Sequence, residues 1–193
     1  MQGGNLLIPW TRIEKEEERL QNLLSKLQQK GTIMEELFIR DNLRGGNVLH
    51  QLIYVLWHND LRRGRRRALE DDDVQEFMKQ ALDSRPALIC ETDKLGGTPL
   101  HLIAFCFHDF IDESVLGMFS YYFKKFEDEY GVEGLYLPPW RMKDKDGNTP
   151  LHKALRSYAP LSCFREFLKF DPELATYQNK EMQTPLHLLV HGN

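Results

Sequence analysis

The sequence predicts an all-α protein, a repeat solenoid of helix-turn-helix units with an N-terminal helical cap. The first observation is a recurring nine-residue pattern: DKLGGTPLH at 93–101, DKDGNTPLH at 144–152 and NKEMQTPLH at 179–187. The second is its spacing, because the motif histidines, with a weaker copy at 42–50, lie 51, 51 and 35 residues apart. Recurrence at such intervals is typical of stacked repeats. The third is a set of apolar stripes with helical periodicity between the copies.

Residues 1–40 are expected to form the N-terminal helical cap. One face of this segment carries an apolar stripe made by Ile13, Leu20, Leu23, Leu24 and Leu27. A stack of repeats needs such a terminal unit, because its polar face keeps the end of the core from water. A coiled-coil dimer is the alternative, although the stripe lasts only about two heptads.

Residues 41–193 are expected to form the array, with about four units, two of them with insertions and the last one incomplete. In the copies at 93–101 and 144–152 an Asp is expected to bond its own backbone in a turn, and a glycine to accept a positive φ angle. A threonine then stands at the helix N-cap, and a proline takes the first helical position, where its missing N–H costs nothing. This structural motif comprises Thr98, Pro99, Leu100, His101, Thr149, Pro150, Leu151, His152, Thr184, Pro185, Leu186 and His187.

The last copy departs from the pattern, since Met182 replaces the turn glycine. A non-glycine residue in the left-handed conformation costs about 1 kcal/mol, so we expect an altered turn there.

Second helices are predicted from the apolar stripes Val74, Phe77, Met78, Ala81 and Leu82; Leu116, Phe119, Phe123 and Phe126; and Phe164, Phe167 and Leu168. Pro86 and Pro172 are expected to stop the first and third of these helices and to begin extended stretches. Insertions are expected between the helices of the first unit, around 61–73, and after a lengthened second helix, around 127–142.

The pattern D-x-x-G-x-T-P-L-H resembles the start of the ankyrin repeat, whose period is about 33 residues. More narrowly, RMKDKDGNTPLHKALR and DPELATYQNKEMQTPLH are similar to the arrays of plant membrane ankyrin proteins of the accelerated-cell-death type. The resemblance implies an ankyrin solenoid that binds another protein as an adaptor or regulator, and the narrower likeness implies plant defence signalling. It also implies that the motif histidine ties turn to helix by hydrogen bonds.

Composition excludes several classes of protein. A net charge of −4 argues against nucleic acid as the main partner. Three cysteines without paired spacing indicate reduced thiols, so we expect a cytoplasmic protein. No apolar run approaches the roughly 18–20 residues that cross a bilayer, so membrane attachment is expected only through segments outside this chain.

The sequence predicts no enzyme. It contains no nucleophile elbow and no phosphate loop, so we expect no catalytic residue, no cofactor and no small-molecule substrate. The motif histidines lie on separate units and cannot surround one metal ion. His187 and His191 are four residues apart but lack the glutamate of a zinc protease motif, so we predict no metal site.

The inserted segment around GLYLPPWRM contains the candidate partner-binding residues Leu135, Tyr136, Leu137, Trp140 and Arg141. Aromatic side chains and arginine are enriched where one protein anchors in another. The alternative is that this loop folds back over the lengthened second helix.

A second candidate is the basic run Arg62, Arg63, Arg65, Arg66 and Arg67, which would bind an anion or a nuclear import receptor. The acidic run at 70–73 follows it, so a self-neutralised loop is the alternative. Two other functions stay open at this stage. The chain could be the cytosolic part of a membrane signalling protein, or an ankyrin-type inhibitor of a transcription factor that enters the nucleus through these arginines.

Overall fold

Seven α helices and two short 3-10 helices make up the part of the chain that the computed structural model describes, residues 45–63, 72–106 and 111–191. No strand occurs among these residues, which confirms the all-α prediction for them. The predicted cap, residues 1–40, lies outside the described residues.

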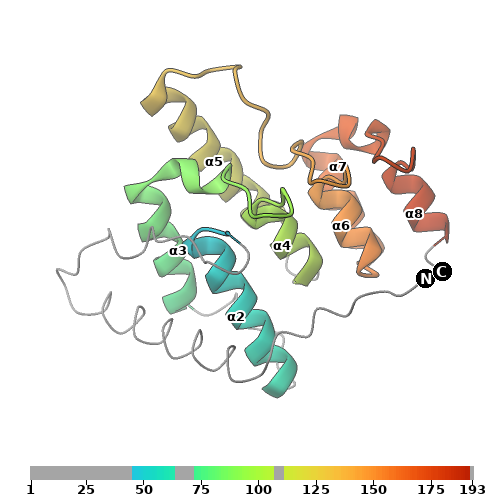
Figure 1. The fold of residues 1–193 in the computed structure, drawn as a ribbon, viewed down its shortest axis with the longest axis horizontal. Coiled ribbons are helices and arrows are strands. Elements are labelled where there is room, and N and C mark those ends of the chain that lie inside the picture. Colours follow the sequence, from blue (N-terminus) through green and yellow to red (C-terminus); the bar gives the residue numbers. More distant parts are fainter. Residues whose placement is uncertain (1–44, 64–71, 107–110, 192–193) are drawn as a thin grey trace.

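The helices form two layers. One layer contains four helices that follow one another side by side (Figure 1), namely α2 (Val48–Arg63), α4 (Pro99–Cys106), α6 (Pro150–Arg156) and α8 (Pro185–His191). The second layer contains α3 (Asp72–Ser84), α5 (Glu113–Tyr130) and α7 (Leu161–Phe170). The 3-10 helix η3 (Pro86–Ile89) packs against α3 and α5, and η5 (Pro172–Thr176) packs against α7 and α8.

The core lies between the two layers. Phe119 of α5 and Phe167 of α7 are its largest fully buried side chains. The predicted stripes of α3 and α5 are buried, and in α7 Phe167 is buried while Phe164 and Leu168 are partly buried. The helical periodicity therefore identified the core-facing sides of the second layer.

Two sequence predictions need correction. Pro86 and Pro172 begin 3-10 helices rather than extended stretches, because the fixed φ of proline suits the first position of a helix. The predicted insertion at 61–73 is in part a longer helix, since α2 continues to Arg63 and α3 starts at Asp72. Helix α2 has 16 residues, whereas α4 has 8. The segment 64–71 between α2 and α3 lies outside the described residues.

The turns stack on one another at the edge of the molecule. Gly96 and Gly147 have φ angles of 77° and 79°. A Cβ on Gly96 would lie 3.0 Å from the backbone nitrogen of Lys145, and one on Gly147 would lie 2.9 Å from that of Lys180. The predicted alteration at Met182 is wrong, because this residue takes the same left-handed conformation with φ of 59°. Its side chain is 67% exposed, so a Cβ has room there.

Candidate functional site

The inserted loop at 131–142 is held at both ends. At its start, Gly131 ends α5 in the left-handed conformation, and the Glu127 carboxylate accepts a hydrogen bond from the Gly134 backbone N–H at 3.0 Å. At its end, Trp140 is half-buried, with its ring edge-to-face against Phe123 and Phe170 at centroid distances of 5.9 and 4.9 Å. The loop is therefore packed against the helices at both of its ends.

One buried carboxylate, that of Asp171, fastens the end of this loop. The indole N–H of Trp140 donates to its Oδ2 at 3.1 Å, and the Arg141 Nη2 donates to its Oδ1 at 2.9 Å. Arg141 also forms an ion pair with Glu173 at 2.8 Å. Because Asp171 is 6% exposed, the bonds to its carboxylate are partly shielded from water, whereas the pair with Glu173 is exposed. Trp140 and Arg141 thus fasten the loop to the rest of the molecule through Asp171. For both residues, the sequence pattern predicts contact with a partner instead.

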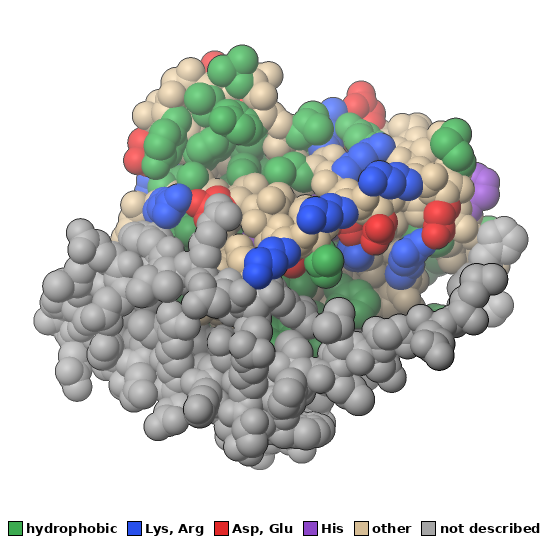
Figure 2. All heavy atoms as spheres, in the orientation of Figure 1, with side chains coloured by type: hydrophobic (Ala, Val, Ile, Leu, Met, Phe, Trp, Pro, Cys, Tyr) green, Lys and Arg blue, Asp and Glu red, His purple; other side chains and the backbone are tan. Residues whose placement is uncertain are grey.

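The tip of the loop points outward. Leu135, Tyr136 and Leu137 are 75%, 52% and 56% exposed. Tyr130, in the last turn of α5, is 51% exposed, and its ring and that of Tyr136 both contact the ring of Phe126. Figure 2 shows hydrophobic side chains gathered over α5 and the loop beyond it, at the upper left of the view. We call Tyr130, Leu135, Tyr136 and Leu137 the tip patch. Three of the five predicted partner-binding residues belong to it, and Tyr130 is an addition that the sequence pattern did not single out.

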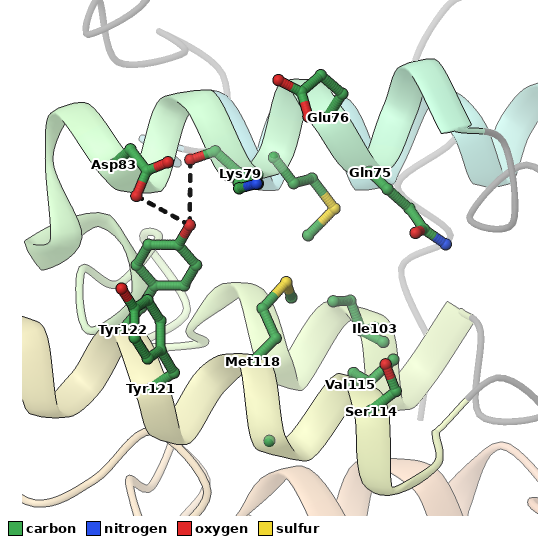
Figure 3. A pocket seen from close by; sticks show the side chains of 12 residues that line it. Gln75, Glu76, Lys79, Asp83, Ile103, Ser114, Val115, Met118, Tyr121 and Tyr122 are labelled. Carbon is green, nitrogen blue, oxygen red and sulfur yellow. Dashed lines mark hydrogen bonds between the residues drawn. The ribbon is translucent and has the colours of Figure 1, made fainter.

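A groove separates α3 from α5 (Figure 3). Its volume is about 980 Å³, and apolar side chains of Met78, Ile103, Val115 and Met118 line it. One end is closed by Tyr122, whose hydroxyl donates to the Asp83 carboxylate at 3.1 Å. Burial and this acidic neighbour raise the pKa of the Tyr122 hydroxyl. No sequence pattern predicts this groove, because it depends on the distance between two helices of different units.

The motif histidines connect each unit to the next. In His101 the ring Nδ1 accepts a hydrogen bond from the Thr98 backbone N–H at 3.1 Å and lies 2.8 Å from the Thr98 hydroxyl. The Nε2 of the same ring pairs with the Asn148 carbonyl of the following unit at 3.0 Å. The tie between turn and helix was predicted, whereas the bond to the next unit was not.

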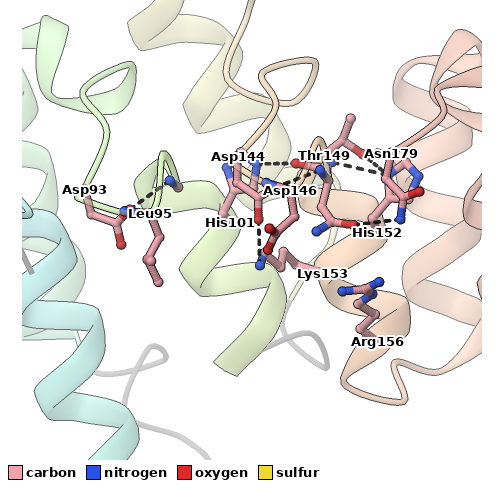
Figure 4. Close-up of polar contacts among 12 residues, drawn as sticks. Asp93, Leu95, His101, Asp144, Asp146, Thr149, His152, Lys153, Arg156 and Asn179 are labelled. Carbon is pink, nitrogen blue, oxygen red and sulfur yellow. Dashed lines mark hydrogen bonds and ion pairs between the residues drawn. The ribbon is translucent and has the colours of Figure 1, made fainter. Parts of the chain in front are cut away.

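The same bridge recurs along the stack. His50 pairs with the Gly97 carbonyl at 2.8 Å, and His152 pairs with the Gln183 carbonyl at 3.1 Å. At the start of α6, Thr149 and His152 form a reciprocal capping box (Figure 4). The turns add backbone bonds from Lys145 N–H to Leu95 O and from Lys180 N–H to Asp146 O, both at 2.9 Å. Adjacent units are thus joined by side-chain and by backbone hydrogen bonds.

Burial favours the neutral imidazole in His101 and His152. It lowers the pKa of His101 to about 4 and also lowers the pKa of His152. A neutral ring whose Nδ1 accepts a bond must carry its proton on Nε2, where it donates to the next unit. Both nitrogens of His101 are therefore in use, and neither is available to hold a metal ion or to transfer a proton to a substrate.

Only the first two residues of the arginine run lie within the described part of the chain. Arg62 and Arg63 are the last residues of α2, and the positions 65–67 lie outside the described residues. Within 45–63, 72–106 and 111–191 there is no group of three or more His, Cys, Asp or Glu side chains that could hold a metal ion. Among the same residues, no helix combines the length and the apolar character that spanning a bilayer requires.

No family model matches the sequence, and no curated protein matches it. The class of protein is therefore defined by the fold alone. The described residues form an all-α stack of helical pairs, joined through buried histidines, that carries a projecting apolar loop.

Proposed function

We propose that the chain is an ankyrin-type repeat array that binds another protein and carries out no reaction of its own. Support for the repeat assignment comes from the equivalence of its units. Three of them begin with a turn, a threonine, a proline and a histidine, and buried histidines bridge from one unit to the next. Stacked units of this kind present an extended surface on a stiff frame, and such surfaces serve protein recognition.

The tip patch carries the proposal of protein binding. Four large apolar side chains that are each at least half exposed, one at the end of α5 and three on the loop that follows, cost free energy in water unless another molecule covers them. The buried histidines, by contrast, are occupied in holding the stack together. On the family resemblance we propose an adaptor or regulatory role, and on its narrower form a role in plant defence signalling.

Affinity capture with matched baits tests this function. The wild-type chain and a Leu135→Ser/Leu137→Ser variant would be immobilised, and captured proteins would be compared by mass spectrometry. Leu95→Ser is the control bait, because Leu95 is 62% exposed on a turn outside the tip patch. We expect a saturable partner that both the wild type and the control retain. The absence of any saturable partner, or turnover of a substrate by the purified chain, would contradict the proposal.

A further inference from the structure

We propose that the tip patch, together with the end of α5, binds a partner segment that combines basic and apolar side chains. This inference rests on the proposed protein-binding function and adds the chemistry of the partner to it. Three features of the described residues carry it: an apolar surface, the rigid support beneath it, and the charges around it.

The support is a layer of aromatic rings. The ring of Phe126, which is 7% exposed, lies 5.3 Å from the ring of Tyr130 and 5.4 Å from the ring of Tyr136. Trp140 and its bonds to Asp171 hold the far end of the loop. A surface ordered before binding loses little conformational entropy when a partner arrives, so its apolar area contributes more fully to affinity.

The charges beside the patch are arranged against the helix dipole. Glu127, Asp128 and Glu129 occupy the last turn of α5, which contains no basic residue. The carboxyl end of a helix carries a partial negative charge, so the charges of these acids are unfavourable there. A fourth acid, Glu133, follows in the loop. A cation from outside the chain would relieve this local repulsion.

The nearby lysine offsets only part of this charge. Lys124 lies one turn earlier on α5 and forms ion pairs with Asp128 at 3.0 Å and with Glu133 at 3.1 Å. Its exposed position makes these pairs weak. Four acids against one lysine leave the surroundings of the tip patch acidic, which favours a partner with Lys or Arg beside its apolar anchors.

The same charges argue against a membrane as the occupant. Leu135, Tyr136 and Leu137 resemble an interfacial membrane anchor by composition alone. An anionic lipid surface would, however, be repelled by the carboxylates at the end of α5 and at Glu133, since membrane-binding surfaces combine apolar residues with Lys and Arg. A protein segment of positive charge satisfies both the apolar and the acidic part of the surface.

Selection from a random peptide library displayed on phage tests the inference without assuming a partner. The full-length chain is the target, and the excess of Lys and Arg over Asp and Glu is compared in selected and unselected peptides. A fluorescent copy of a selected peptide is then titrated against Leu135→Ser/Leu137→Ser and Asp128→Asn/Glu129→Gln. The controls are Leu95→Ser and Glu76→Gln, which change an exposed leucine and an exposed acid elsewhere.

We expect selected peptides enriched in basic and apolar residues. The leucine variant should raise their Kd by about tenfold or more, since exposed anchors dominate such contacts. The acid variant should raise it less, and more strongly at low salt. Both controls should bind as the wild type does, and none of the four variants should melt at a lower temperature than the wild type because the altered side chains are exposed.

Three results would overturn the inference. Peptides without basic enrichment would show that the acids do not select the partner. Equal binding to the leucine variant would place the binding surface elsewhere, while the proposed function would stand. Binding of the wild-type chain to anionic vesicles that the leucine variant loses would make the tip patch a membrane anchor. A failure of the proposed function looks different, because then neither peptide selection nor affinity capture yields a saturable ligand.

Discussion

Replacing His101 by alanine is expected to lower the stability of the protein at neutral pH and to remove much of its sensitivity to acid. The ring is 2% exposed and bonds the Thr98 backbone on one side and the Asn148 carbonyl on the other. Each buried polar group left without a partner costs about 1–3 kcal/mol. We therefore expect the variant to lose at least about 2 kcal/mol of unfolding free energy at neutral pH.

The acid sensitivity follows from the pKa of His101, which burial lowers to about 4 in the folded protein from an ordinary value of 6.5. Between these two values the unfolded chain binds the proton and the folded chain does not, so stability falls as the pH is lowered through this range. From about pH 7.5 to about pH 5, linkage gives a loss of about 2 kcal/mol for this one group. His152 shifts in the same direction and adds to the effect.

Urea denaturation followed by circular dichroism at both pH values measures the two effects together. The wild type minus the variant isolates His101, because the carboxylates titrate in both proteins. His187→Ala is the matched control, since His187 holds the same motif position but is exposed in the last unit. Full acid sensitivity in His101→Ala, or unchanged stability at neutral pH, would refute the structural role of the histidine bridge.

Three further predictions concern the groove, the loop and the arginine run. Gly117→Ala is expected to raise the free energy of unfolding by about 0.5–1 kcal/mol, because glycine weakens a helix interior and an added Cβ there would meet no atom within 4 Å. A lower free energy of unfolding in urea denaturation would mean that the groove beside α5 has no room for the added methyl group. Trp140→Ala is expected to lower the melting temperature, because the variant loses the bond to Asp171, and to leave the affinity for a captured partner unchanged. An unchanged melting temperature with about 30-fold weaker binding would instead make Trp140 a partner anchor. If the arginines of 62–67 form an electrostatic site, changing three of them to glutamine is expected to weaken binding to anionic vesicles or import receptors. Added salt should remove this effect, because exposed charges more than about 8 Å apart are screened at physiological ionic strength. Equal binding at low salt would favour the self-neutralised loop.

Local patterns in the sequence predicted much of the fold. Pro99, Pro150 and Pro185 begin α4, α6 and α8 as the N1 preference of proline indicated. The positive φ angles of Gly96 and Gly147 also followed from their place in the turn. These features depend on a few neighbouring residues, and short-range chemistry decides them.

Contacts between distant residues could not be predicted in the same way. Trp140 was identified as an aromatic in an inserted loop, but its partner Asp171 lies 31 positions away, and no pattern in the sequence connects the two. The bond from His101 to the Asn148 carbonyl spans 47 positions and depends on how one unit is placed on the next. The loop therefore looked like one interface, whereas the structure divides it into a supporting end and an exposed tip.

The stacking of the turns explains where this chain accommodates its extra residues. At the turns, Gly96 and Gly147 approach the backbone of the next unit so closely that not even a methyl group fits without a shift. An insertion there would separate the units and break the bridges from the histidines. The helix ends carry no such restriction, and the additional length is found in α2, in α5 and in the loop that follows α5. Among the described residues, the added surface of the loop after α5 therefore lies at the end of a helix, which is where the tip patch lies.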